Sequence, residues 1–176
     1  PLEHVVKCLV FYHPADPAEL RAEQDALLLE VWQACNKSGH ELLLEIILPE
    51  NGPDKDERHY HDMLEHFYQL GIQPDWWKLP PLSSASWQQI TALIEREDPW
   101  SRGILILGLD APSDKLRAGF AEAAAHPMIK GFAVGRTIFG QPSRRWMQGE
   151  LSDEALIEEV KRNYLTLIGY WREARR

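Results

Sequence analysis

Three charged side chains stand inside short apolar runs that have the length of β-strands. They are Lys7 in VVKCLV, Glu45 in LLLEII and Lys78 in WWKL. A charge buried in hydrocarbon without a partner costs several kcal/mol, so these strands need a shared polar environment. Two ammonium groups and one carboxylate compensate each other in such a cluster. The pattern therefore predicts that the three side chains meet in one cavity.

The residue types in this cluster favour Schiff-base chemistry. An amine attacks a ketone only in its neutral form, which burial and a neighbouring cation both favour. Lys78 shares a strand face with Trp76, two residues earlier, and Lys7 is the second cation. Glu45 can move protons while a carbinolamine forms and dehydrates. The resulting iminium accepts the electrons of a breaking carbon–carbon bond. This is the mechanism of a class I aldolase. The competing interpretation of each lysine is an edge residue whose amine reaches water.

Glycines and an arginine mark the ends of the last two expected strands. Gly135 and Arg136 follow one of them, and Gly108 lies near the end of the other. Glycine lets backbone N–H groups approach phosphate oxygens, a guanidinium adds a bidentate contact, and the last loops of βα barrels often bind phosphate. We therefore expect a phosphate site here. The simpler alternative is a tight turn at Gly135 followed by a surface arginine.

Histidines give a weaker signal. His13 follows the first expected strand and either contacts substrate or lies in a solvated loop. His59, His61 and His66 stand at the start of a helix beside a polar loop and lack a fourth ligand, so no metal site and no cofactor are predicted. The chain contains no Ser-His-Asp arrangement and no P-loop.

The elements that must hold these residues alternate along the chain. Apolar runs of strand length occur at 5–12, 42–48, 76–79, 103–109 and 129–134, separated by stretches with helical periodicity. The runs are roughly 30 residues apart, the length of a strand with its crossover helix. Five βα units and a parallel sheet are therefore predicted.

Several residues signal where the helices begin and end. Helix starts are expected at Asp16 as N-cap with Pro17 in the first helical position, after the Ser83-Ser84 turn, at Pro112-Ser113 and after Ser152. Gly39 is expected to end the first helix. The polar stretch 50–58 is expected to be a loop.

Two architectures are built from serial βα units. Helices cover both faces of an open doubly wound sheet, where a charge within a strand would be buried. An eight-stranded barrel of ~250 residues instead points alternate strand residues into a lumen whose upper layer is the active-site floor. We therefore predict an α/β fold of the TIM (β/α)8-barrel type, with residues 1–176 as a single domain that supplies about five of the later units. The start at Pro1, without an initiator Met, fits a cut through a larger polypeptide.

Composition narrows the class of protein. With 44% hydrophobic and 26% charged residues the chain is globular, and a net charge of −8 argues against a nucleic-acid surface. No apolar run approaches the ~20 residues of a membrane span, and no signal pattern precedes the first strand, so a cytoplasmic protein without a membrane partner is expected. Cys8 and Cys35 form neither a disulfide framework nor a metal-binding pattern.

Five segments resemble, in order, the later strands of the class I tagatose-1,6-bisphosphate aldolase family: VKCLVFYHPADP, HELLLEIILP, PDWWKLPPL, ILILGLDAP and GFAVGRTIFG. The closer likeness is to the aldolase-like domain fused behind the sugar kinase of bacterial inositol catabolism. It covers nearly the whole chain, and LLLEI, WWKL and GRTIFG are its most specific parts.

The resemblance implies a role for each candidate residue: Lys78 as Schiff-base lysine, Glu45 as acid/base, Lys7 as auxiliary lysine, and Arg136, Gly135 and Gly108 as the phosphate site. It implies a lyase that splits 2-deoxy-5-keto-gluconate 6-phosphate into dihydroxyacetone phosphate and malonate semialdehyde without a metal or cofactor. It also implies an N-terminal sugar kinase as fused partner.

The family's first three strands have no counterpart in this sequence, so the chain is expected to be inactive alone. Homo-oligomerisation, or a partner chain that supplies the missing strands, is left open. A rival from another class is a non-catalytic regulatory barrel that binds a sugar phosphate. A second rival is a lyase or isomerase that uses the same phosphate site without a Schiff base.

Overall fold

In the computed structural model, which describes residues 1–176, five strands form one parallel sheet. The strands are β1 (Val6–Phe11), β2 (Leu42–Ile47), β3 (Trp76–Leu79), β4 (Gly103–Ile106) and β5 (Ile129–Phe132). They lie side by side in the order of the sequence, and every neighbouring pair is parallel. The prediction of five strands in a parallel sheet is therefore confirmed. The order shows no reversal of the kind that defines a doubly wound sheet.

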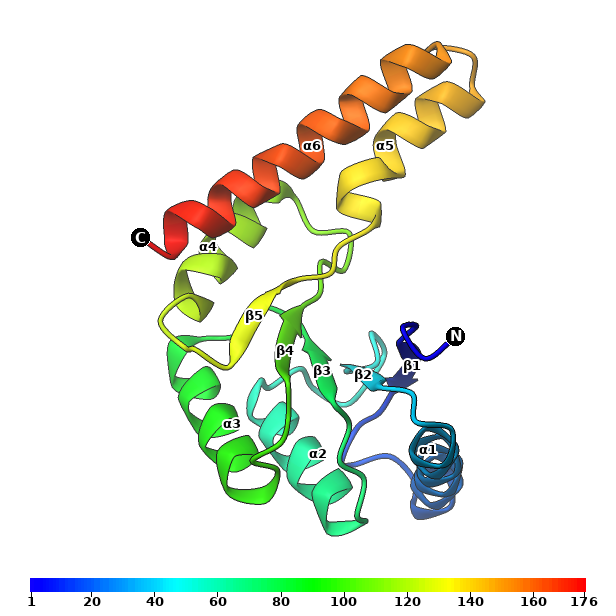
Figure 1. Cartoon of the computed structure of the whole chain (residues 1–176), viewed down its shortest axis with the longest axis vertical. Coiled ribbons are helices and arrows are strands. Elements are labelled where there is room, and N and C mark those ends of the chain that lie inside the picture. Colours follow the sequence, from blue (N-terminus) through cyan, green and yellow to red (C-terminus); the bar gives the residue numbers. More distant parts are fainter.

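Six helices accompany the sheet: α1 (Ala18–Ser38), α2 (Arg58–Gln69), α3 (Ser84–Glu97), α4 (Ser113–Ala123), α5 (Arg136–Met147) and α6 (Asp153–Ala174). Helices α1 to α4 connect successive strands, and right-handed crossovers of this kind put their helices on one face of the sheet. Helices α5 and α6 form a hairpin that projects from the body, with α6 returning along α4 (Figure 1). No helix combines the length and apolar character needed to cross a bilayer.

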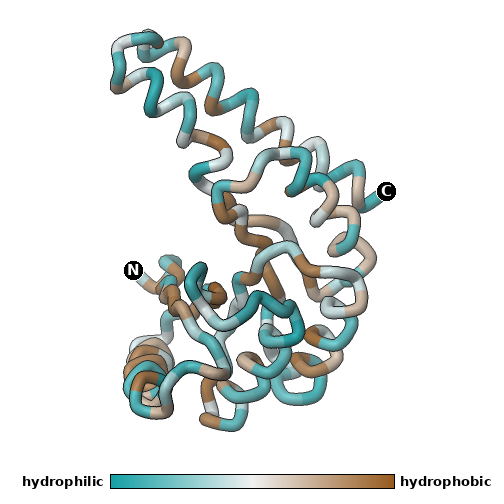
Figure 2. Tube along the Cα trace, turned by 180° about the vertical axis from the view of Figure 1, so that it is seen from behind, coloured by the Kyte–Doolittle hydropathy of each residue, from teal (hydrophilic) through white to brown (hydrophobic).

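The core lies between the helices and the outer face of the sheet. Outward-pointing strand residues such as Leu44, Trp77 and Ile104 are fully buried there. On the opposite, inner face, Leu9 and Phe11 remain 39% and 52% exposed. Hydrophobic segments run through the strands at the centre of the trace (Figure 2). The sheet is thus covered on one face and open on the other, an arrangement compatible with part of a TIM-like fold.

Local signals set several helix ends as predicted. The hydroxyls of Ser83 and Ser152 each accept a hydrogen bond from the backbone N–H three residues on, at the starts of α3 and α6. Gly39 follows α1 with a φ of 74°, a left-handed conformation that favours glycine.

The predicted start of the first helix is wrong in detail. Asp16 does not cap α1, which begins at Ala18 with Pro17 as N-cap and no side-chain cap. The Asp16 carboxylate instead accepts the backbone N–H of His13 at 2.9 Å and closes the turn after β1. A short polar side chain can bond to the turn or to the helix, and here the turn prevails.

Helix α5 was not predicted, because Gly140 and Pro142 lie inside it and both residues disfavour helix interiors. Both are buried, together with Ile138, and α5 packs along α6. Tertiary packing therefore outweighs local propensity in this segment.

Trp77 is one of the two largest fully buried side chains, and its Nε1 donates to the Tyr68 hydroxyl at 2.8 Å. Replacing Trp77 by Ala is expected to lower the free energy of unfolding by about 3–5 kcal/mol, because it leaves a cavity and a hydroxyl without its donor. Urea denaturation measures the loss. Trp100→Ala, at a residue 89% exposed, is the control and should change stability by no more than about 0.5 kcal/mol. Equal losses in the two variants would contradict this description of the core.

Buried tyrosines make stability depend on alkaline pH. Burial raises the pKa of Tyr60 and Tyr68, and burial with the nearby Asp25 carboxylate raises the pKa of Tyr12 to about 12. Tyrosines in the unfolded chain ionise at about pH 10. The stability that comes from keeping these buried tyrosines neutral is therefore complete below that pH, and it is lost as the pH rises through their pKa values in the folded protein. We expect urea midpoints to fall across this window. The fall should be smaller in Tyr12→Phe, and identical pH profiles for the variant and wild type would contradict the assignment to Tyr12.

Candidate active site

A cleft of about 1050 Å³ opens over the carboxyl ends of the strands. Its floor includes Leu9, Glu45 and Lys78 from the inner face of β1, β2 and β3. One wall is the loop between β2 and α2, and the other is formed by the connections after β4 and β5. The carboxyl edge of a parallel sheet is where ligands bind in α/β proteins, so this cleft is the candidate active site.

Strand register explains why Glu45 meets both lysines. Glu45 is in register with Leu9 of β1 and with Lys78 of β3. Residues in register on neighbouring parallel strands point to the same face about 4.8 Å apart. Lys7 lies two positions before Leu9 and therefore shares that face one layer lower. The sheet thus brings the three predicted charges together on its inner face.

Both lysines contact the same carboxylate oxygen. Lys78 Nζ lies 3.2 Å and Lys7 Nζ 2.8 Å from Oε2 of Glu45. The side chain of Lys78 is 15% exposed and that of Lys7 is 48% exposed. Lys78 lines the cleft, whereas Lys7 lies outside its lining, on the edge strand of the sheet. A molecule in the cleft can therefore reach the amine of Lys78, whereas Lys7 contacts Glu45 from outside the cleft.

The indole of Trp76, which lies beneath Lys78, is held by a hydrogen-bonded cluster at the amino ends of the strands. Trp76 precedes Lys78 by two residues, and its Nε1 donates to Oε2 of Glu41 at 2.7 Å. The other oxygen of Glu41 pairs with Arg102 at 2.8 Å. This group holds the indole in the layer below Lys78 and lies outside the cleft lining.

The end of β4 approaches the end of β5 closely at Gly108. A Cβ added there would lie 2.8 Å from Cγ1 of Val134, so any larger residue would have to displace the Val134 side chain. Leu109 and Asp110 follow with φ values of 47° and 59°, a conformation that costs a non-glycine residue roughly 1–2 kcal/mol. Gly108, Leu109 and Asp110 all line the cleft. Backbone strain of this kind gathers at ligand sites.

The start of α5 forms the rest of this wall. Gly135 is its N-cap and offers no side-chain cap, so the first N–H groups of the helix lack an intrahelical acceptor. Arg136 lines the cleft beside them, and Thr137 ties the two connections together by donating to the carbonyl of Ala111 at 3.0 Å. The structure thus brings Gly108, Gly135 and Arg136 together in an arrangement suited to an anion. Their role in phosphate binding stays a prediction.

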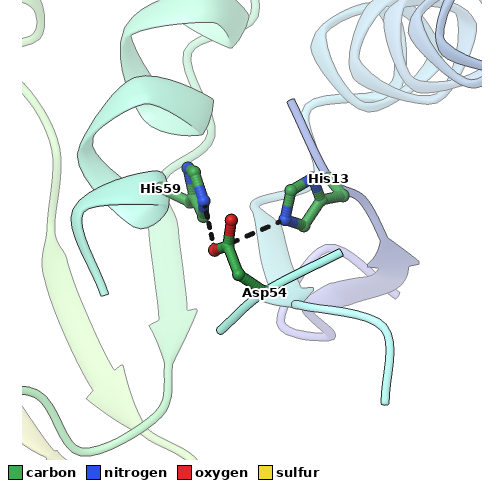
Figure 3. Close-up of side chains that lie close together, drawn as sticks. All are labelled: His13, Asp54 and His59. Atoms are coloured by element: carbon green, nitrogen blue, oxygen red, sulfur yellow. Dashed lines mark hydrogen bonds and ion pairs between the residues drawn. The ribbon is translucent and has the colours of Figure 1, made fainter. Parts of the chain in front are cut away.

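The loop after β2 brings Lys55 to the opposite wall, a residue that the sequence analysis did not single out. Next to it, Asp54 meets two histidines (Figure 3). Oδ1 of Asp54 lies 2.6 Å from Nε2 of His59 and 3.9 Å from Nε2 of His13. The ligand atoms of the three residues lie within 4.8 Å of one another, the spacing of a metal site.

The ring of His13 does not fit that role. Its Nδ1 accepts the backbone N–H of Ala15 at 3.0 Å, so the proton of the neutral ring lies on Nε2 and no lone pair faces Asp54. Histidines that bind metals show the opposite arrangement, with the second ring nitrogen donating. We therefore assign no metal to this cluster.

The histidines lie apart from the cleft lining. His13 is fully buried and lines no part of the cleft, so both sequence-based interpretations of it are wrong. His66 pairs with Asp25 at 2.8 Å, and His61 contacts Asp62 at 3.3 Å.

Comparison with proteins of curated function found no match. A family model matches residues 1–175, almost the whole chain. The chain therefore belongs to the family described as uncharacterized proteins conserved in bacteria, DUF2090.

Proposed function

We propose that this chain carries the Schiff-base site of a class I aldolase that cleaves a phosphorylated keto sugar acid. The observation that carries the proposal is the position of Lys78. Its amine lines a large cleft at the carboxyl edge of the sheet, 3.2 Å from a carboxylate that a second lysine also contacts. A nucleophilic amine, a proton carrier and a second cation are the groups that iminium formation requires.

The fold that we propose for the active protein is a TIM-type barrel, of which these five strands are the later part. The sequential strand order and the helices on a single face support it. The inner face supports it too, because it combines the charged cluster with exposed Leu9 and Phe11, as expected for residues of a lumen that further strands complete.

The reaction begins with imine formation on Lys78. Glu45 takes a proton from the Lys78 ammonium, and the neutral amine adds to the C5 ketone of 2-deoxy-5-keto-gluconate 6-phosphate. Glu45 returns the proton to the carbinolamine oxygen, which leaves as water. The product is an iminium between Nζ and C5, whose positive charge attracts the electrons of the next step.

The carbon–carbon bond then breaks between C3 and C4. Glu45 accepts the proton of the C3 hydroxyl, the C3–O bond becomes a carbonyl, and the C3–C4 electrons pass into the iminium to form an enamine. C1 to C3 leave as malonate semialdehyde. Protonation of the enamine at C4 and hydrolysis of the imine release dihydroxyacetone phosphate, and water replaces the bond to Lys78. The phosphate lies at the start of α5, held by Arg136 and the free N–H groups beside Gly135.

Borohydride trapping tests the proposal directly. Reduction of the full-length polypeptide with dihydroxyacetone phosphate should leave a stable adduct on the peptide that contains Lys78, detected by mass spectrometry. Saturable binding of dihydroxyacetone phosphate without an adduct would instead indicate a regulatory sugar-phosphate domain. Cleavage of the keto acid without an adduct would indicate a lyase that does not use a Schiff base.

A further inference from the structure

Three cationic side chains line the cleft, Lys55, Lys78 and Arg136, and the proposed mechanism does not use Lys55. Neither Lys55 nor Arg136 takes part in an ion pair, whereas Lys78 is paired with Glu45. They stand on opposite walls, since Lys55 follows β2 and Arg136 follows β5, three strands away. At about 4.8 Å per strand, the two walls are roughly 14 Å apart at the sheet. Lys78, on β3, lies between them.

The backbone on both sides of Lys55 is anchored. Asp54 accepts the N–H of Asp56 at 3.0 Å and contacts His59 at 2.6 Å, at the first turn of α2. Asp56 accepts the backbone N–H and the Nε of Arg58, each at 2.9 Å. The carboxylates beside Lys55 are therefore occupied by their own partners. The Lys55 side chain is exposed at the cleft and forms no ion pair, although the carboxylates of Glu50 and Glu57 line the same wall. Its ammonium is therefore free to bind an anion.

The cationic groups on the two walls suit anions of different charge. A phosphate dianion needs several donors, and the start of α5 offers a guanidinium together with free backbone N–H groups. A carboxylate is a monoanion that one ammonium balances. We propose that Lys55 binds the carboxylate of the substrate and thereby selects a keto sugar acid over a keto sugar that lacks the acid group.

This inference rests on the proposed function and identifies which end of the substrate faces which wall. The carboxylate and the phosphate stand at opposite ends of the six-carbon chain, with the ketone between them. Lys55, Lys78 and Arg136 occur in that same order across the sheet, from β2 through β3 to β5. The specificity-determining contact is thus remote from the bond that breaks.

The test is Lys55→Gln in the full-length polypeptide. A charge-assisted contact made equally in the ground and transition states affects binding alone, so the KM for the keto acid should rise roughly 10- to 100-fold with kcat unchanged. Borohydride trapping of dihydroxyacetone phosphate, which lacks the carboxylate, should not change. Lys37→Gln is the control, because Lys37 is an exposed lysine near the end of α1 outside the cleft.

The outcomes separate this inference from the proposed function. If wild-type protein forms no adduct, the proposed function itself is wrong. If the adduct forms and Lys55→Gln leaves the KM for the keto acid unchanged, the function stands and the role of Lys55 is rejected. If Lys55→Gln weakens the trapping of dihydroxyacetone phosphate as well, Lys55 contacts the phosphate and the proposed orientation is reversed.

Discussion

Replacement of Lys78 by methionine is expected to abolish the borohydride-dependent adduct and to lower kcat by about 10⁴-fold or more, the loss typical of a missing nucleophile. Methionine keeps an unbranched side chain that extends as far as the ε position and lacks the amine. Lys7 and Glu45 can still pair, because their 2.8 Å contact does not involve residue 78. Steady-state turnover and peptide mass mapping after reduction together measure the effect.

Lys7→Met is the matched comparison. Lys7 contacts the same oxygen of Glu45 but lies outside the cleft lining, so its loss should leave the adduct on Lys78 and change only the rate at which it forms. An adduct that persists in Lys78→Met would show that another amine is the nucleophile. If the mass mapped to residue 7, the roles of the two lysines would be exchanged.

The strands could be predicted because successive side chains of a strand point to opposite faces of the sheet, and most of them are apolar here. The alternation of Trp76, Trp77 and Lys78 is visible in the sequence and reappears as two faces, one under the helices and one on the cleft. The start of α1 and the whole of α5 were less predictable. Asp16 has two competing hydrogen-bond partners, and Pro142 is tolerated in α5 only because of packing that no local pattern encodes.

The floor of the cleft could also be predicted, because a charge inside an apolar strand is conspicuous and has few stable solutions. Lys55 carried no such signal: it lies in a polar loop, where a charged residue is ordinary. What distinguishes it is that Asp54 and Asp56, on either side of it, bond to His59 and Arg58 at the start of α2, and these bonds depend on the folded path of the loop. Likewise, the tautomer of His13 is set by the N–H of Ala15, which only the backbone geometry reveals.

Glu45 is the group on which both lysines depend, so Glu45→Gln should have the second largest effect on catalysis. The amide keeps the shape of the side chain but cannot accept the proton of the Lys78 ammonium or of the C3 hydroxyl. We expect kcat to fall by about 10²- to 10⁴-fold, the range for loss of a general acid–base group. Reduction after long incubation should still give the adduct on Lys78, because the nucleophile itself is present.

Loss of the carboxylate also leaves two ammonium groups facing one neutral amide, so stability should fall as well, by about 1–3 kcal/mol. Glu41→Gln separates the two effects. Glu41 bonds Trp76 and Arg102 on the same sheet but outside the cleft, so this variant should lose stability while keeping its kcat. Urea denaturation and steady-state kinetics on both variants distinguish loss of stability from loss of proton transfer. If Glu41→Gln slowed turnover as much as Glu45→Gln, the loss of rate would follow from loosening of the sheet, and Glu45 would not be the proton carrier.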